Sequence, residues 1–321
     1  MVLLGAASLL SLSLNAQKAM ASCSISGTAT INSGGVLEQC TVNQGGIYDI
    51  SAYGGAGGGV TVGGVWYNGS SGAEISAEFS LSAGETLEIV TGSAGASGTD
   101  TSYTKSAGGG GGTVLALDNN GTLTALLAAG GGGGDAINSD DTFSGYSGGY
   151  GQGGQLARTN TTSNPDPGTG GVVGGTNNYA ASGGGFFTNG ASGSGGGAGL
   201  SFVGQSLGSP ADTGGEGSTY VYYNYSGAGG GGGGYDGGVG GAGDNGGTGG
   251  TNYYNPTLAT DVTQVAGTGN VASPTAGQLD FSLVSTSVAP SSPSSVPEPP
   301  AILLSVTFLG LLGFVRYRVR A

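Results

Sequence analysis

The sequence predicts an all-β body, and three observations support this fold class. Residues 74–81 alternate between apolar and polar side chains, which is typical of a strand with one buried face. No segment between residues 22 and 295 carries the apolar stripe of an amphipathic helix. Glycine supplies 76 of the 321 residues and gathers in tracts between the apolar segments. Short strands joined by glycine-rich connections are therefore expected.

The first residues predict export. An apolar run over 2–14 is too short to span a bilayer comfortably. Ala19-Met20-Ala21 follows it and permits cleavage by a signal peptidase before Ser22. We therefore expect a signal peptide over 1–21.

The segment 22–45 holds both cysteines of the chain, Cys23 and Cys40. Two strands and an intervening turn are expected here, over 24–31, 36–42 and 32–35. Because an exported protein folds in an oxidising compartment, we predict a disulfide between Cys23 and Cys40 that staples this N-terminal β-hairpin. Acylation of Cys23 is the alternative, since Met20-Ala21-Ser22-Cys23 faintly resembles a lipoprotein box.

Residues 46–286 are expected to form one glycine-rich β domain. Its strands are predicted where apolar residues alternate or cluster, over 47–53, 74–81, 113–117, 122–127 and within 271–287. Asn120-Gly121 supplies the positive φ angles of a tight hairpin turn. In the last strand, Leu279, Phe281 and Leu283 are expected to point inward.

The glycine tracts are the most unusual feature, and the densest is 227–250, where 16 of 24 residues are glycine. Such a tract is disordered by default, because it has no side chains to bury and loses much backbone entropy on ordering. Alternatively, several tracts form extended helices with three residues per turn, which hydrogen-bond to one another. The connection 130–250 is too long for an ordinary loop, so it is either disordered or a structure in its own right.

Aromatic residues through and just beyond this connection favour order, since disordered linkers carry few of them. They would seal a glycine bundle by packing or, alternatively, stack against sugars. They are Tyr146, Tyr150, Tyr179, Tyr220, Tyr222, Tyr223, Tyr225, Tyr235, Tyr253, Tyr254, Phe186, Phe187 and Phe202.

Composition excludes several function classes. Acidic residues outnumber basic ones by 19 to 6, and only Lys105 and Arg158 are basic between residues 22 and 295, so nucleic-acid binding is not expected. The chain has no His, which removes the common triads and histidine metal sites. We expect no catalytic, cofactor-binding or metal-binding residues. A glycosidase-like carboxylate pair is an alternative reading of four glutamates on predicted strands and turns, which are otherwise solvated: Glu74, Glu78, Glu85 and Glu88.

The C-terminal segment carries the strongest motif. A Ser/Pro linker over 287–295 leads to Val296-Pro297-Glu298-Pro299, and an apolar run over 301–315 predicts a membrane helix roughly 22 Å long. Three arginines then form a basic stop: Arg316, Arg318 and Arg320. The arrangement over 296–321 closely resembles the PEP-CTERM sorting signal. That resemblance implies processing by exosortase, a membrane thiol transpeptidase of Gram-negative bacteria that make exopolysaccharide. An ordinary tail anchor is the alternative.

The body also resembles a known domain. The order of motifs begins with Gly46–Gly58, in which Ile47–Tyr53 lead into glycine, and continues through 77–90, 108–113 and 126–134. This order is similar to the glycine-rich extracellular domain of the anaplastic lymphoma kinase and leukocyte tyrosine kinase receptors. The resemblance implies a jelly-roll-like β-sandwich with an inserted bundle of polyglycine helices and no catalytic activity. The chain lacks a kinase domain and the further cysteines of the receptor domain, so ligand binding is not implied.

Together these features predict an exported, exosortase-processed, non-enzymatic structural or adhesive protein. It would pass through an inner-membrane intermediate, held by its C-terminal helix, to the cell surface or extracellular matrix of a Gram-negative bacterium. Expected partners are the exosortase-type enzyme and exopolysaccharide or matrix proteins. The alternative is a lectin-like protein that binds exopolysaccharide, and an enzyme acting on polysaccharide is the third possibility.

Overall fold

A computed structural model describes residues 23–62, 64–98, 104–138, 154, 168–171, 180–194, 196–216, 218–220, 226–242, 245–269, 271 and 273–286. The chain divides into two compact units, Met1–Thr286 and Ser287–Ala321, and all described residues belong to the first. The described part is all-β and sandwich-like, with two main sheets and no helix. The predicted fold class is confirmed at this level.

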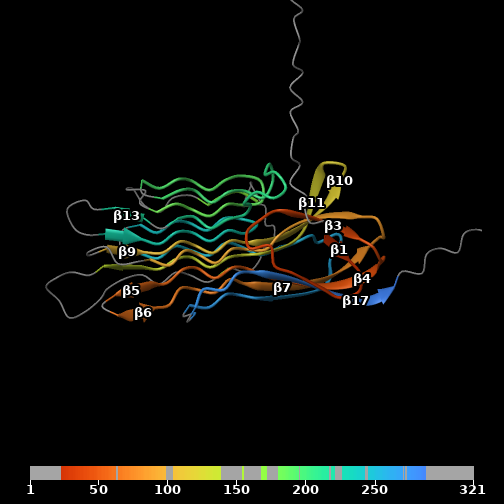
Figure 1. Cartoon of the computed structure of the whole chain (residues 1–321), viewed down its shortest axis with the longest axis horizontal. Coiled ribbons are helices and arrows are strands. Elements are labelled where there is room, and N and C mark those ends of the chain that lie inside the picture. The colour runs from red at the N-terminus through yellow and green to blue at the C-terminus, as the bar shows by residue number, and fades with distance from the viewer. Residues whose placement is uncertain are drawn as a thin grey trace, which may run out of the picture. The chain divides into compact units, whose positions relative to one another are not determined.

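The first sheet has six strands in the order β1-β3-β8-β10-β11-β15 (Figure 1). Their bounds are Cys23–Ile25, Glu38–Val42, Thr86–Val90, Thr113–Asn119, Thr122–Ala129 and Tyr253–Tyr254. The turn between β10 and β11 contains Asn120 (φ 55°) and Gly121 (φ 87°), so the predicted hairpin and its positive φ angles are confirmed.

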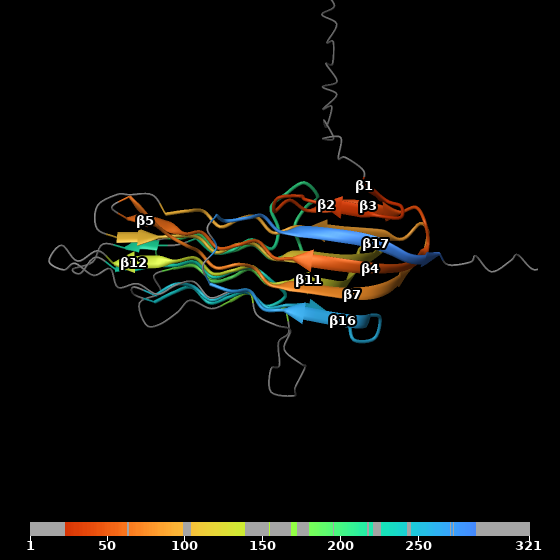
Figure 2. The same cartoon turned by 90° about the horizontal axis from the view of Figure 1, so that it is seen from below.

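The second sheet has five strands in the order β16-β7-β4-β17-β2, seen face on in Figure 2. Their bounds are Thr260–Val265, Glu74–Leu81, Gly46–Tyr53, Gln278–Thr286 and Ala29–Ile31. In β7 the buried and less buried residues alternate along the strand as predicted. Three short strand pairs complete the described β structure: β5 (Val60–Val62) with β6 (Val65–Tyr67), β9 (Thr104–Ser106) with β12 (Ala136–Asn138), and β13 (Ser218–Tyr220) with β14 (Ser226–Ala228).

The main hydrophobic core lies between the two sheets. Its largest fully buried side chains include Tyr48, Leu87 and Leu115, and Phe281 packs edge-on to Tyr48 with ring centroids 6.4 Å apart. The Tyr48 hydroxyl donates to the carbonyl oxygen of Gln44 at 2.6 Å, which satisfies its polar group at the edge of the core. Leu279 and Phe281 are buried and Leu283 packs against the core, as the sequence predicts.

A second core covers the other face of the six-stranded sheet. Val114 and Ala128 from β10 and β11 pack there with Phe186, Phe202 and Tyr235. Because both faces of this sheet are covered, successive residues of its central strands are buried, as in Thr113–Ala116 and Ala125–Ala129. These strands therefore read as apolar runs in the sequence rather than as alternating patterns.

The glycine tracts form a third region, which we call the glycine bundle. It comprises 54–59, 69–73, 92–98, 107–112, 130–135, 180–186, 211–216, 229–234, 237–241 and 245–251. These segments run side by side between the strands of the sandwich and the short strand pairs (Figures 1 and 2). Several continue a strand directly: 54–59 follows β4 and leads to β5, and 130–135 follows β11 and leads to β12.

Hydrogen bonds in the bundle follow a period of three residues. The segment 229–234 shows this most completely, because its N–H groups donate in turn to three neighbouring segments at 2.8 to 3.3 Å. Gly230 and Gly233 donate to Ala107 and Gly110, Gly231 and Gly234 to Ala181 and Gly184, and Gly229 and Gly232 to Asn245 and Thr248. The interior of the bundle is therefore built from main-chain atoms on all sides.

Glycine is required by this spacing. A Cβ atom at Gly231 would overlap the carbonyl oxygen of Gly238, and one at Gly183 would overlap that of Gly232. Since the obstructing atoms are backbone, no side-chain rotation relieves the overlap.

The predicted N-terminal hairpin over 22–45 is wrong. Its first predicted strand is divided at Gly27 (φ 70°) into β1 and β2, which lie in different sheets. β1 pairs with β3 in parallel, and β2 pairs with β17. The turn residues also make long-range contacts: the N–H groups of Ser33 and Gly34 donate to the Thr91 hydroxyl at 2.6 and 3.2 Å. The predicted turn over 32–35 does form, with positive φ angles at Gly34 and Gly35 and a hydrogen bond from the N–H of Val36 to the carbonyl oxygen of Ser33 at 3.4 Å. Tertiary packing sends the strands on either side of the turn to other partners.

Candidate functional site

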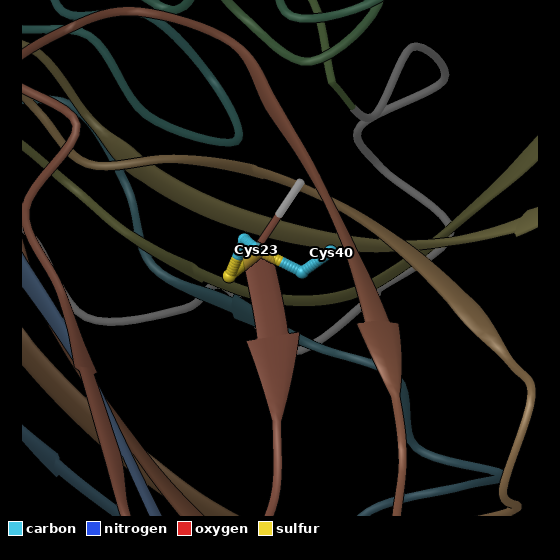
Figure 3. Close-up of a disulfide and its surroundings, with 2 residues drawn as sticks. All are labelled: Cys23 and Cys40. Carbon is cyan, nitrogen blue, oxygen red and sulfur yellow. A yellow bond between two sulfur atoms is a disulfide. The ribbon is translucent and has the colours of Figure 1, made fainter. Parts of the chain in front are cut away.

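The predicted disulfide between Cys23 and Cys40 is present (Figure 3). The two residues are direct register partners of β1 and β3, with Cα atoms 4.3 Å apart. Cys40 is fully buried in the main core. Closing a loop of this length, with a sequence separation of 17, stabilises a protein by about 3 kcal/mol. The bond attaches the first described residue of the chain to the sandwich.

The predicted sorting residues lie outside the described residues. This holds for Val296, Pro297, Glu298 and Pro299, for Arg316, Arg318 and Arg320, and for the segments 1–21, 287–295 and 301–315. Within the part of the chain that the structure describes, no helix is long and apolar enough to cross a membrane.

The outer face of the five-stranded sheet is polar. Asp49, Ser51 and Tyr53 of β4 lie opposite Glu78, Ser76 and Glu74 of β7. On the other side of β4, the same residues lie opposite Ser282, Asp280 and Gln278 of β17. No other described segment crosses this face in Figure 2. We call it the polar face, and it combines carboxylates, hydroxyls, an amide and one aromatic ring.

Hydrogen bonds hold several side chains of the polar face in place. The hydroxyl groups of Ser76 and Thr263 lie 2.7 Å apart, and Thr30 donates to Asp280 at 2.7 Å. The Gln278 amide donates to both carboxylate oxygens of Asp280, at 2.8 and 2.7 Å. Burial raises the pKa of the Tyr53 hydroxyl, and the nearby carboxylates of Glu74 and Asp280 raise it further. The face is therefore a partly ordered array of donors and acceptors.

The four glutamates of the glycosidase alternative are not brought together. Glu74 and Glu78 lie on the polar face, whereas Glu85 accepts from the N–H of Ser82 in a turn at 3.0 Å. Glu88 belongs to the six-stranded sheet, where burial and the nearby Asp118 raise its pKa. Among the described residues, no group of three or more His, Cys, Asp or Glu side chains is placed to hold a metal ion.

Sequence reasoning missed Asp212, a buried carboxyl in the glycine bundle. Its main chain donates to Ser201 at 3.3 Å and accepts from Gly112 at 2.9 Å, and its Oδ1 accepts from the N–H of Gly234 at 3.1 Å. Oδ2 is buried without a hydrogen-bond partner. Burial raises the pKa of this carboxyl well above its usual range, and the hydrogen bond from Gly234 offsets part of that effect. A single Asp among Ala, Thr and Gly reads as a turn residue, so the sequence gives no sign of its burial.

The described aromatic residues of the connection pack in the second core. Phe186 stacks on Phe202 with ring centroids 5.2 Å apart and contacts Tyr235 at 5.7 Å. Tyr235 in turn stacks on Tyr253. Phe187 is the exception, with 52% of its surface exposed. Tyr254 packs against the main core instead. The other predicted aromatics lie outside the described residues or have undescribed side chains: Tyr146, Tyr150, Tyr179, Tyr220, Tyr222, Tyr223 and Tyr225.

No protein-family model matches the chain, and a search of curated protein sequences finds no relative.

Proposed function

We propose that this chain is an exported, non-enzymatic structural or adhesive protein of the cell surface or extracellular matrix, processed through its C-terminal segment by an exosortase-type enzyme. The observation that carries the proposal is the glycine bundle. Each inner segment is hydrogen-bonded to neighbours in three directions, which makes a stiff body out of main-chain atoms. A stiff body of this kind is suited to a structural protein that bears mechanical load or holds an adhesive surface away from the cell.

At a finer level, we propose that the bundle consists of polyglycine-type helices inserted between the strands of a jelly-roll-like sandwich. The three-residue period of hydrogen-bond partners supports this, because such a helix has three residues per turn and makes no internal hydrogen bonds. The strand order supports the sandwich topology, since the chain passes from β7 in one sheet to β8 in the other and returns between β15 and β16.

Two features of the chain support an extracellular location. The disulfide Cys23–Cys40 is a bond that persists in oxidising compartments. Between residues 22 and 295 the chain offers only Lys105 and Arg158 to proteases that cut after basic residues.

Complementation of a deletion strain tests the proposal. Cells would receive the wild-type chain, Glu298→Ala, or Glu85→Ala as a matched control, because Glu85 lies in a turn outside the polar face. We expect the wild type and E85A to reach the surface and restore attachment of cells to a substratum. E298A should remain in the inner-membrane fraction and fail to restore it. Processing of E298A like the wild type would contradict sorting, and wild-type localisation without any effect on attachment would contradict the adhesive role.

The lectin-like alternative is favoured by the polar face. Tyr53 is flanked there by Glu74 and Gln278, a combination of ring, carboxylate and amide that can hydrogen-bond and stack with sugars. Affinity electrophoresis of the mature protein through gels containing exopolysaccharide from the producing cells would separate the two functions. Retardation that is lost in Tyr53→Ala but kept in Ser282→Ala would favour the alternative. Equal migration with and without polysaccharide would exclude it.

A further inference from the structure

Two tyrosines from different parts of the fold, Tyr235 and Tyr253, lie face to face in the second core. Tyr235 directly follows the bundle segment 229–234, whereas Tyr253 belongs to β15 at the edge of the six-stranded sheet. Their ring centroids are 3.9 Å apart and their planes differ by 11°. Both main chains are held: the N–H of Tyr235 donates to Thr251 at 3.0 Å, and Tyr253 pairs with Ala128.

The surroundings of the pair keep both phenols neutral at physiological pH. Burial raises the pKa of both hydroxyl groups, and the neighbouring Tyr253 and Asp236 raise that of Tyr235 further. Because the two ring planes are nearly parallel and their centroids are 3.9 Å apart, the face of one ring lies directly against the face of the other.

We propose that Tyr235 and Tyr253 form a site of oxidative cross-linking, at which a carbon–carbon bond joins the two rings when the protein meets peroxide and a peroxidase. Each phenol loses one electron and one proton to the oxidant. The two radicals combine their unpaired electrons in a Cε–Cε bond. The hydrogen on each bonded carbon then leaves as a proton while each oxygen regains one, which restores both aromatic rings. For each bond formed, one hydrogen peroxide is reduced to two waters.

The pair is distinguished from other tyrosines of the described residues. Tyr48 is fully buried, its hydroxyl donates to Gln44, and its ring neighbour is Phe281. Tyr254, next to Tyr253 in β15, packs against the opposite core. Among the ring contacts within the described ranges, Tyr235–Tyr253 is the pair in which both partners are tyrosines.

A bond at this point would have a structural effect. It would join the glycine bundle to the edge of the sandwich and close the segment between residues 235 and 253 into a loop, which constrains the unfolded chain as a disulfide does. The inference goes beyond the proposed function and does not depend on the sorting signal.

Oxidation of the mature protein tests the inference. Dilute protein would be treated with peroxidase and hydrogen peroxide, and in parallel with a small photogenerated one-electron oxidant, because Tyr235 is only 9% exposed. Mass spectrometry of thermolysin digests should then find the peptide of Tyr235 joined to that of Tyr253, with the loss of two hydrogen atoms. Tyr253→Phe and Tyr235→Phe keep the stacked rings but should lose this product. Tyr48→Phe should keep it.

Two further measurements make the outcome decisive. Wild-type protein unfolded in guanidinium before oxidation should lose the preference for this pair, and oxidised native protein should melt at a higher temperature than untreated protein. Dityrosine scattered over other residues of the native protein would overturn the proposal. So would a Tyr235–Tyr253 product no more abundant in native than in unfolded protein.

Discussion

Asp212 accepts a hydrogen bond from the main-chain N–H of Gly234 at 3.1 Å, while its second carboxylate oxygen is buried against glycine without a partner. The residue is fully buried and adopts a φ angle of 45°, which side-chain-bearing residues rarely do. It also bonds Gly112 and Ser201 through its main chain. Asp212 thus links its own bundle segment, 211–216, to the segments 107–112 and 229–234, and also to Ser201 outside the bundle.

This arrangement predicts a pH dependence of stability. Because the pKa of Asp212 is raised in the folded state, the folded protein holds the proton more tightly than the unfolded chain. The stability that the folded protein gains from protonated Asp212 is fully present below the ordinary aspartate pKa of about 3.9. This stability is lost as pH rises through the raised pKa of the folded state. Within that window the slope is at most about 1.4 kcal/mol per pH unit.

Asp212→Asn isolates this contribution. It keeps the acceptor for Gly234 but cannot ionise, so the difference in unfolding free energy between wild type and variant should shrink or reverse in sign as pH rises above about 4. Urea unfolding at a series of pH values measures it. Parallel curves for the two proteins would show that Asp212 does not titrate differently on folding.

Because the bundle is close-packed, we expect that adding one methyl group at an inner glycine lowers the free energy of unfolding. In Gly231→Ala the new Cβ would overlap the carbonyl oxygen of Gly238, and the backbone must move to relieve it. We expect a loss of about 1–3 kcal/mol or more in unfolding free energy. Gly269→Ala is the matched control, since a Cβ there meets nothing within 4 Å. Equal stability of the two variants would show that the bundle is not close-packed.

The second core predicts a contrast between two phenylalanines. Phe202 is fully buried and stacks on Phe186, so Phe202→Ala should cost about 3–5 kcal/mol. Phe187→Ala removes a ring that is 52% exposed and should cost well under half of that. Urea unfolding measures both. A small effect of F202A would mean that the outer face of the six-stranded sheet is not sealed by this segment.

Sequence reasoning succeeded where the pattern is local. The alternation in β7 reports its one buried face, and Asn120-Gly121 reports the turn between β10 and β11. The two cysteines had one possible partner each, so their disulfide was predictable. The sorting residues Val296–Pro299 remain a prediction.

Sequence reasoning failed where long-range packing decides. Ile25 and Ile31 both enter the main core, but from opposite sheets, because the chain crosses between sheets at Gly27. No local signal announced β15 or β16, whose partners lie far away in the chain. The polar face likewise depends on the register between strands. The alternation within each strand predicts which side chains point outward, but it does not predict which strand lies next to it.

Amide hydrogen exchange of the segment 229–234 tests the central claim most directly. If each of its N–H groups is bonded to a neighbouring segment, these amides should exchange as slowly as those of β4 and β7 in the sandwich. Rapid exchange of 229–234 while β4 and β7 stay protected would show that the glycine tracts are disordered linkers, and the account of a hydrogen-bonded bundle would be wrong.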